Sequence, residues 1–185
     1  METFNGLNFK VFEESDIDIF SPIMKLAFDE DSKMHRNGED GGPPGYNNGE
    51  YFRQHYLDIA SNSYAIYKND VPVGGICLFI NDNLEGYLQN LFIDIAFWNQ
   101  GIGQVMWNYV ENKFSCVNIW RLETAGYSRR NHNFYVNKCG FKIIHIINPN
   151  KKNRPYPGYY VFEKNLEEKE KTDWSAFIAR KRRSI

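Results

Sequence analysis

The stretch from residue 85 to residue 147 limits the folds open to this chain more narrowly than any other, because strand and helix signals alternate in it around a glycine turn. A long strand is predicted over Glu85–Asp94, and Gly101-Ile102-Gly103 then opens a helix that runs to Phe114. A strand over 117–123, a short helix over 131–138 and a strand over 140–147 follow. This order predicts a mixed α/β fold in which helices cover a sheet.

Alternation within the long strand predicts which of its side chains share a face. Strict period-two spacing places Tyr87, Gln89 and Leu91 on one face and Leu88, Asn90 and Phe92 on the other. In the helix that follows, the buried stripe is predicted to comprise Ile102, Val105, Met106, Tyr109 and Val110.

The N-terminal half adds strands to the same sheet. We expect a strand at 7–12, a helix at 16–30 capped by Ser15, and a short helix at 50–59. Strands at 64–68 and 72–80 form a hairpin about Asn69-Asp70, and Asp82-Asn83 makes the next turn. Between the two predicted helices lies a loop over Asn37–Glu50 that is rich in glycine, proline and asparagine. Loops of this length are usually functional or disordered.

The C-terminal end divides the chain into two parts. A last strand is predicted at 159–163, so that residues 1–165 form one domain. Residues 166–185 are predicted to form an appended amphipathic helix, because Trp174, Phe177 and Ile178 recur at helical spacing.

Composition excludes several classes of protein. Hydrophobic residues make up 42% of the 185 residues, enough for a substantial core, and the formal net charge of −1 gives no overall attraction to nucleic acid or membrane. There is no apolar run long enough to span a bilayer and no signal-like N-terminus, so we expect a cytoplasmic protein. Cys77, Cys116 and Cys139 lack metal-like spacing and are predicted to be reduced core thiols.

The glycine turn is a candidate anion site. The first amides of a helix have no partner within the helix, and the positive end of the helix dipole favours an anion there. Gly101 and Gly103 would let a diphosphate approach the backbone closely. The turn is neither a P-loop nor a dinucleotide fingerprint, and an ordinary strand-to-helix turn is the alternative.

Two motifs together resemble the GNAT superfamily of acyl-CoA N-acyltransferases. The first is Leu91-Phe92-Ile93-Asp94-Ile95-Ala96-Phe97-Trp98-Asn99-Gln100-Gly101-Ile102-Gly103, and the second runs from Asn131-His132-Asn133-Phe134-Tyr135 to Gly140-Phe141. They cover about 50 residues, and the order of strands fits the family over most of residues 5–163. Three positions depart from the motif of the family. Ile95 stands where members usually have proline, Trp98 where they usually have arginine or glutamine, and Gln100 where they often have lysine or arginine.

The resemblance implies a central, mostly antiparallel sheet that splays open, with acetyl-CoA as co-substrate. Its diphosphate would lie on the turn at Asn99, Gln100, Gly101, Ile102, Gly103 and Gln104, and its pantetheine arm would pair with the backbone of Leu91, Phe92 and Ile93. Asn131 would hold the pantetheine or the diphosphate. Tyr135 would protonate the departing thiolate, the alternative being a tyrosine buried for packing.

On the acceptor side, the attacking amine has to be neutral, so a base is expected near the thioester. Glu123 is the first candidate for catalysis and substrate binding, with Glu85 second, and water as a further alternative. Tyr46, in the loop, is a candidate to contact substrate, and the acidic residues at 29–31 and 39–40 suit a cationic amine. The four histidines lack ligand spacing, so no metal is expected.

These observations predict an N-acetyltransferase that works by direct attack of a primary amine, from a small molecule or a peptide. The main alternative is a catalytically silent acyl-CoA-binding module that senses the cofactor or assembles with a partner, and a homodimer is a further candidate. The basic segment Arg180-Lys181-Arg182-Arg183 also suggests nucleic-acid binding. The favoured interpretation is that these cations lie at the C-terminal end of a helix and complement its dipole. No membrane partner is expected.

Overall fold

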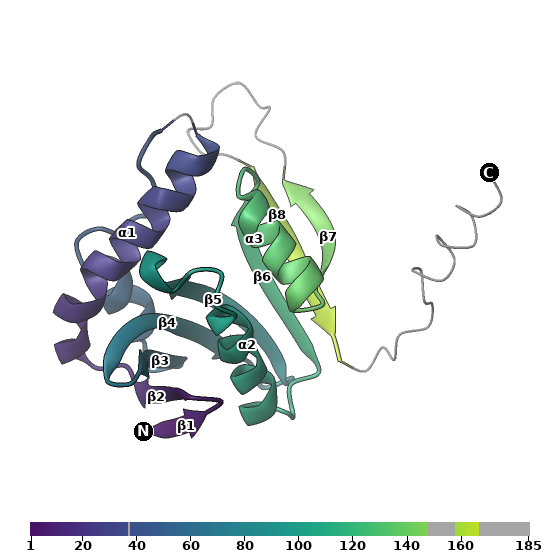
Figure 1. Cartoon of the computed structure of the whole chain (residues 1–185). Coiled ribbons are helices and arrows are strands. Elements are labelled where there is room, and N and C mark those ends of the chain that lie inside the picture. Colours follow the sequence, from purple (N-terminus) through teal and green to yellow (C-terminus); the bar gives the residue numbers. More distant parts are fainter. Residues whose placement is uncertain (37, 148–157, 167–185) are drawn as a thin grey trace.

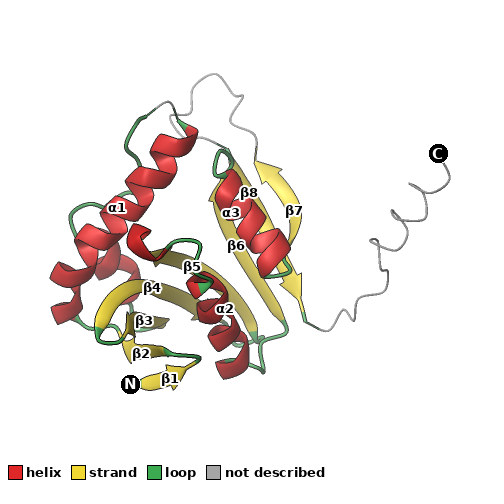
Figure 2. Cartoon of the chain, in the orientation of Figure 1, coloured by secondary structure: helices red, strands yellow, loops and turns green. Residues whose placement is uncertain are grey.

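The computed structural model of the chain describes residues 1–36, 38–147 and 158–166 (Figures 1 and 2). The strands are β1 (Glu2–Phe4), β2 (Leu7–Val11), β3 (Ser61–Lys68), β4 (Val71–Ile80), β5 (Glu85–Ile93), β6 (Ile119–Ala125), β7 (Lys142–Ile147) and β8 (Tyr159–Asn165). The helices are α1 (Ile17–His35), α2 (Ile102–Lys113) and α3 (Arg129–Asn133). Shorter helical turns are η1 (Glu14–Asp16), η2 (Phe52–Tyr56), η3 (Ile95–Phe97) and η4 (Phe134–Lys138).

The strands form one sheet in the order β1-β2-β3-β4-β5-β6-β8-β7. Every pair of neighbours is antiparallel except β5 and β6, which run parallel and are joined through α2. The predicted hairpin is confirmed, because Asn69 and Asp70 connect β3 to β4 with φ angles of 50° and 63°, the left-handed pair that a two-residue hairpin turn needs. The predicted mixed α/β class, with a mostly antiparallel sheet, is therefore confirmed.

Helices cover both faces of this sheet (Figure 1). Helix α2 packs on one face, where Trp107 and Trp120 lie edge to face at 5.4 Å within the larger core. Helix α1 and turn η2 pack on the other face, where Phe12 stacks on Phe52 at 4.8 Å in a second core. The predicted stripe of α2 is buried except for Val105, which is partly exposed. The splayed part of the sheet thus has a helical layer on each side.

The predicted assignment of β5 side chains to the two faces of the sheet is wrong beyond Gln89. A bulge between β4 and β5 leaves Gln89 without a partner, since Leu88 pairs with Leu78 whereas Asn90 already pairs with Cys77. One extra residue moves every later side chain to the opposite face. Leu88 therefore belongs to the core under α2, whereas Phe92 packs in the core under α1.

Two local predictions were also wrong. Ser15 does not cap α1, because it lies inside η1 and the helix begins after Asp16. The carboxylate of Asp16 instead accepts the backbone amide of Glu13 at 2.9 Å, which closes a capping box one turn earlier. Cys116 is exposed in the turn after α2, whereas Cys77 and Cys139 are buried thiols.

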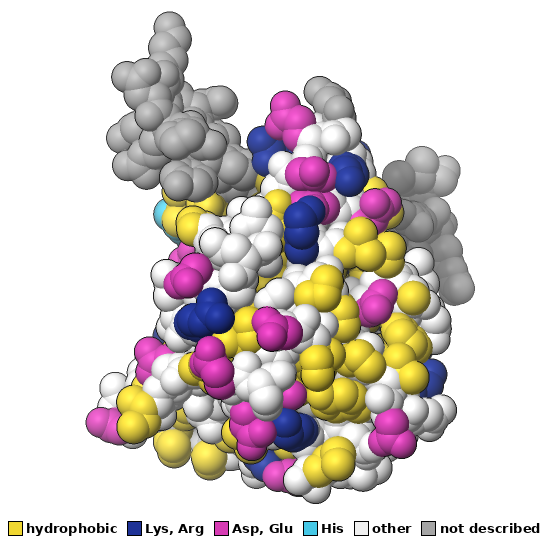
Figure 3. Space-filling view, turned by 90° about the vertical axis from the view of Figure 1, so that its left-hand side faces the viewer, with side chains coloured by type: hydrophobic (Ala, Val, Ile, Leu, Met, Phe, Trp, Pro, Cys, Tyr) yellow, Lys and Arg dark blue, Asp and Glu magenta, His cyan; other side chains and the backbone are white. Residues whose placement is uncertain are grey.

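The face turned toward the viewer in Figure 3 carries lysine, arginine and carboxylate side chains interspersed among apolar ones. This mixture agrees with the near-zero net charge of the chain and gives that face no field of a single sign. Among the described helices, none is both long and apolar enough to cross a bilayer. The predicted C-terminal helix, with Trp174, Phe177 and Ile178, lies outside the described residues, so the division at residue 165 stays a prediction.

Candidate active site

The sheet opens between its two parallel strands. β5 pairs with β6 only from Glu85 to Leu88, against Ile119 to Leu122. Beyond that point β5 continues along β4 and β6 continues along β8, so their C-terminal halves diverge. The bulge at Gln89 coincides with the start of the divergence, since a bulge bends its strand and increases the local twist. Three hollows surround this opening.

The first hollow, which we call the glycine-turn cavity, has a volume of about 370 Å³. It is lined by Ile93, Phe97, Trp98, Asn99, Gly101, Ile102, Gly103, Gln104, Arg130, Asn131, Asn133, Phe134 and Lys138. Gly101 has a φ of 78°, a left-handed conformation that favours glycine, and α2 begins at the next residue. A Cβ on Gly103 would lie 3.1 Å from the Ile93 side chain and from the Phe134 ring. The start of α2 therefore lies tightly between β5 and η4.

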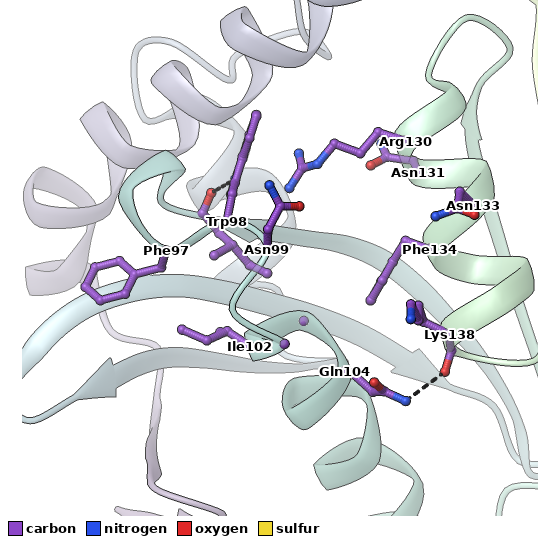
Figure 4. Close-up of a pocket in the computed structure, with 13 residues that line it drawn as sticks. Phe97, Trp98, Asn99, Ile102, Gln104, Arg130, Asn131, Asn133, Phe134 and Lys138 are labelled. Carbon is purple, nitrogen blue, oxygen red and sulfur yellow. Dashed lines mark hydrogen bonds between the residues drawn. The ribbon is translucent and has the colours of Figure 1, made fainter.

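The charged side chains of the glycine-turn cavity are both cationic, Arg130 and Lys138. The Arg130 guanidinium lies over the Trp98 ring, 3.4 Å from its centroid, and reaches from α3 across the cavity (Figure 4). Burial lowers the pKa of Arg130, and the charge of Asp31 partly opposes this effect. Stacking on an aromatic ring leaves the hydrogen-bonding edge of a guanidinium free for an anion.

Trp98 also fixes the end of β5. Its indole Nε1–H donates to the backbone carbonyl of Ile93 at 2.8 Å (Figure 4). Across the cavity, the Gln104 side-chain amide donates to the carbonyl of Lys138 at 3.2 Å. Side-chain hydrogen bonds thus connect the segment after η3 to the end of β5, and α2 to η4.

The second and third hollows lie on the other side of the opening. A narrow hollow of about 60 Å³ is lined by Ala27, Phe28, Asp31, Leu91, Phe92, Ile93, Trp98, Arg130 and Asn131. The third, which we call the tyrosine cavity, has a volume of about 390 Å³ and is lined by Tyr51, Tyr87, Tyr127, Tyr135 and Tyr159 among others. Asn131 lines all three hollows. Its amide donates to the Thr124 hydroxyl at 3.4 Å, which orients it from the end of β6.

Tyr135 lies in η4, one turn after Asn131, and is 8% exposed. Its ring packs edge to face on Phe141 at 5.9 Å, and it lines the tyrosine cavity. Burial raises the pKa of its hydroxyl well above the usual value, with smaller contributions from Cys139 and Asp31. The phenol therefore carries its proton throughout the neutral range.

The acceptor-side candidates lie in different places. Glu123 lies on β6 just past the last β5–β6 pair and lines the tyrosine cavity, where its charge adds to burial in raising the pKa of Tyr87 to about 12. Glu85 is ion-paired with Arg121 at 3.2 Å and is not among the residues that line this cavity. Tyr46 is not among them either, and its hydroxyl donates to the Asp29 carboxylate at 2.6 Å.

Among the cavity residues that were not singled out from the sequence are three charged ones, Arg130, Lys138 and Asp31. Arg130 directly precedes the second motif, and Lys138 lies within it. Both were therefore adjacent in sequence to residues that the motif had already marked as part of a site. Asp31 was counted only as one member of an acidic cluster. Within the described residues, no group of three or more histidine, cysteine or carboxylate side chains could hold a metal ion.

The sequence matches the pattern of the acetyltransferase (GNAT) family over residues 27–141. The uncharacterized protein YrkN of Bacillus subtilis (strain 168) is 34% identical over 91 residues. That match covers 49% of this chain and 49% of YrkN, so the matched segment spans about half the length of this relative.

Solved structures share the fold at low sequence identity. The ribosomal-protein-S18-alanine N-acetyltransferase of Escherichia coli superposes with a TM-score of 0.65 at 12% identity, covering 90% of this chain and 97% of that one. The PaiA N-acetyltransferase of Thermoplasma acidophilum, in complex with coenzyme A, superposes with a TM-score of 0.64 at 13% identity, covering 86% and 98%. Likeness at this level of identity shows the fold alone.

Proposed function

Since the chain belongs to the acetyltransferase (GNAT) family, we propose that it is an N-acetyltransferase that moves an acetyl group from acetyl-CoA to a primary amine. One observation carries this proposal: the sheet opens between a cavity with cationic side chains and a cavity lined by tyrosines, and Asn131 borders both. An anionic cofactor and an amine would approach the opening from opposite sides. Both structural neighbours described above are N-acetyltransferases, and one of them is in complex with coenzyme A.

The glycine-turn cavity fits a diphosphate by the chemistry of its donors. Its charged side chains are Arg130 and Lys138, and the first residues of α2 line the same space, at the helix end whose dipole favours an anion. In this proposal the diphosphate lies against the turn of Asn99, Gln100, Gly101, Ile102, Gly103 and Gln104. Arg130, held flat on Trp98, supplies the positive charge that Gln100 does not.

The pantetheine arm would then lie along Leu91, Phe92 and Ile93, where β5 has left β6. Asn131 would hydrogen-bond this arm from α3. The acetyl thioester would reach the narrow hollow. This hollow shares Trp98 and Arg130 with the glycine-turn cavity, and Leu91 with the tyrosine cavity.

The reaction itself is assigned to two side chains of the tyrosine cavity. The amine attacks the thioester carbonyl carbon as a neutral nitrogen, and Glu123, directly or through water, accepts the proton that this nitrogen loses as the amide forms. The new C–N bond forms, the C–S bond breaks, and Tyr135 gives its proton to the departing thiolate. Tyr46 stays a candidate for substrate contact, and its hydrogen bond to Asp29 would have to open for this role.

The test is release of free thiol from acetyl-CoA in the presence of a panel of primary amines. The proposal predicts turnover by the wild type, and a loss of about 100-fold to 10,000-fold in kcat for Tyr135→Phe, the range that one general acid supplies. The dissociation constant for acetyl-CoA should stay unchanged in this variant. Tyr160→Phe, on β8 outside the cavity lining, is the matched control and should keep full activity.

A wild type that binds acetyl-CoA but releases no thiol with any amine would overturn the catalytic proposal in favour of a silent acyl-CoA-binding module. Tyr135→Phe with full turnover would instead remove the assigned role of Tyr135.

A further inference from the structure

The walls of the tyrosine cavity are of a kind that binds organic cations. Five tyrosines line it, together with Phe28 from α1 and the loop segment 41–44. Aromatic rings attract ammonium groups through the negative charge of their faces, most strongly where water is excluded. A volume of about 390 Å³ is within the range of small-molecule sites.

Asp31 places a carboxylate in this cavity from the opposite side of the sheet to α2. It is 8% exposed and lines both the narrow hollow and the tyrosine cavity. Its carboxylate accepts the Ser128 hydroxyl at 3.1 Å. Its neighbour His35 is 3.7 Å from the same oxygen, but the ring nitrogen concerned already lies 2.7 Å from the Asp31 backbone carbonyl.

Cations near Asp31 are held elsewhere. Arg36 lines the cavity, but its guanidinium is ion-paired with Glu39 at 2.9 Å and lies 5.6 Å from the Tyr127 ring centre. Arg130 lines the narrow hollow together with Asp31 and feels its charge, but its guanidinium is stacked on Trp98 and forms no ion pair with Asp31. In the part of the chain that the structure describes, no lysine or arginine forms an ion pair with Asp31. A buried carboxylate is costly unless a cation accompanies it, so this position is matched to a cation that comes with the substrate.

The acceptor nitrogen itself cannot be that cation during the reaction, because it has to be neutral to attack. The cavity holds a second carboxylate, Glu123, on a different element. One carboxylate can therefore take the proton from the attacking nitrogen while the other keeps a second, charged nitrogen in place.

Resting on the function proposed above, we propose that the acceptor is a small organic dication of the diamine type: one nitrogen is acetylated, and Asp31 and the tyrosine rings hold the other as an ammonium. Asp31 is then a residue that determines substrate specificity. A monoamine of the same length fills the same apolar space but leaves Asp31 without its cation.

The experiment compares α,ω-diaminoalkanes of three to eight carbons with the n-alkylamines of equal length, as acceptors in the thiol-release assay. The wild type should show a KM about tenfold or more lower for the best diamine than for its matched monoamine, the factor that about 1.4 kcal/mol supplies. In Asp31→Asn, the ratio of the monoamine KM to the diamine KM should fall to near one. Glu30→Gln, at the preceding residue of α1 and outside the cavity lining, should keep the wild-type ratio.

The outcomes separate this inference from the function on which it rests. Turnover of diamines and monoamines with equal KM in the wild type would overturn the diamine assignment and leave the acetyltransferase standing. An unchanged ratio in Asp31→Asn would remove Asp31 from specificity. Turnover of a peptide N-terminus in preference to every diamine would overturn the substrate class, whereas no turnover of any amine would overturn the enzyme itself.

Discussion

The glycine-turn cavity and the tyrosine cavity are of nearly equal size, about 370 and 390 Å³, but opposite in charge. Among the described residues, the first is lined by Arg130 and Lys138 and by no carboxylate. Within the same part of the chain, the second is lined by Asp31 and Glu123 and by one cationic side chain, Arg36, which is paired to Glu39. This difference in charge supports the proposal that the splayed sheet receives an anionic reactant in one cavity and a cationic reactant in the other, and that the two would meet at the opening between β5 and β6.

The largest effect on cofactor binding is expected from removing the Arg130 guanidinium from the glycine-turn cavity. Arg130→Ala should weaken acetyl-CoA binding about 10-fold to 100-fold, because a hydrogen bond to a charged group is worth about 1.5 to 3 kcal/mol. Binding should also depend less steeply on salt, since one ionic contact is lost. Calorimetric titration at two salt concentrations measures both effects.

Arg129→Ala is the matched control for this prediction. Arg129 is the preceding residue of α3, carries the same charge and is not among the residues lining the cavity. If both variants lose affinity equally, the effect is one of overall charge, and the assignment of Arg130 to the diphosphate is wrong.

A smaller effect is expected at His132, which is adjacent in sequence to Asn131, the residue that borders both cavities. His132 lies in α3 beside Asn131, stacks on Tyr160 at 4.5 Å and lies 3.0 Å from the carbonyl of Ala125 through its Nε2. Burial lowers the pKa of His132, opposed by its hydrogen bond to Ala125 and by Asp31. The unfolded chain therefore binds a proton more readily than the folded protein.

Because the folded pKa is depressed, the stabilising contribution of neutral His132 is complete above about pH 6.5, the unfolded value, and is lost as the pH falls through the folded pKa. Urea unfolding between pH 8 and pH 5 should show a modest decline in unfolding free energy. The decline should be smaller in His132→Gln, which keeps a donor for Ala125. An identical pH dependence in the two proteins would contradict this account.

Much of the fold could be predicted from local patterns. The hairpin at Asn69-Asp70 and the helix after Gly101 are encoded by residues adjacent in sequence, and both are present where expected. The bulge at Gln89 could not be predicted, because it depends on the pairing of β5 with β4, more than ten residues away in the chain. A prediction from sequence assumes strict alternation of side chains along a strand, and here that assumption places Phe92 on the wrong face.

The site shows the same division between local and distant signals. The turn at Gly101 and the pair Asn131 and Tyr135 are readable because each motif is contiguous in sequence. The stacking of Arg130 on Trp98 joins residues from two separate motifs, and Asp31 reaches Ser128 from α1, 97 residues earlier in the chain. Such contacts are fixed by how the layers pack, so they become visible only in the structure.

The central claim is that the glycine-turn cavity holds the cofactor. Calorimetric titration with acetyl-CoA and with free CoA, on the wild type and on Gly103→Glu, tests it most directly. A side chain at Gly103 would meet Ile93 and Phe134 at 3.1 Å, and a glutamate would add a negative charge to a cationic cavity. We predict micromolar-range binding of both ligands to the wild type, and none to the variant while its circular dichroism stays that of the wild type. Equal binding by a folded Gly103→Glu, or no binding by the wild type, would contradict the account.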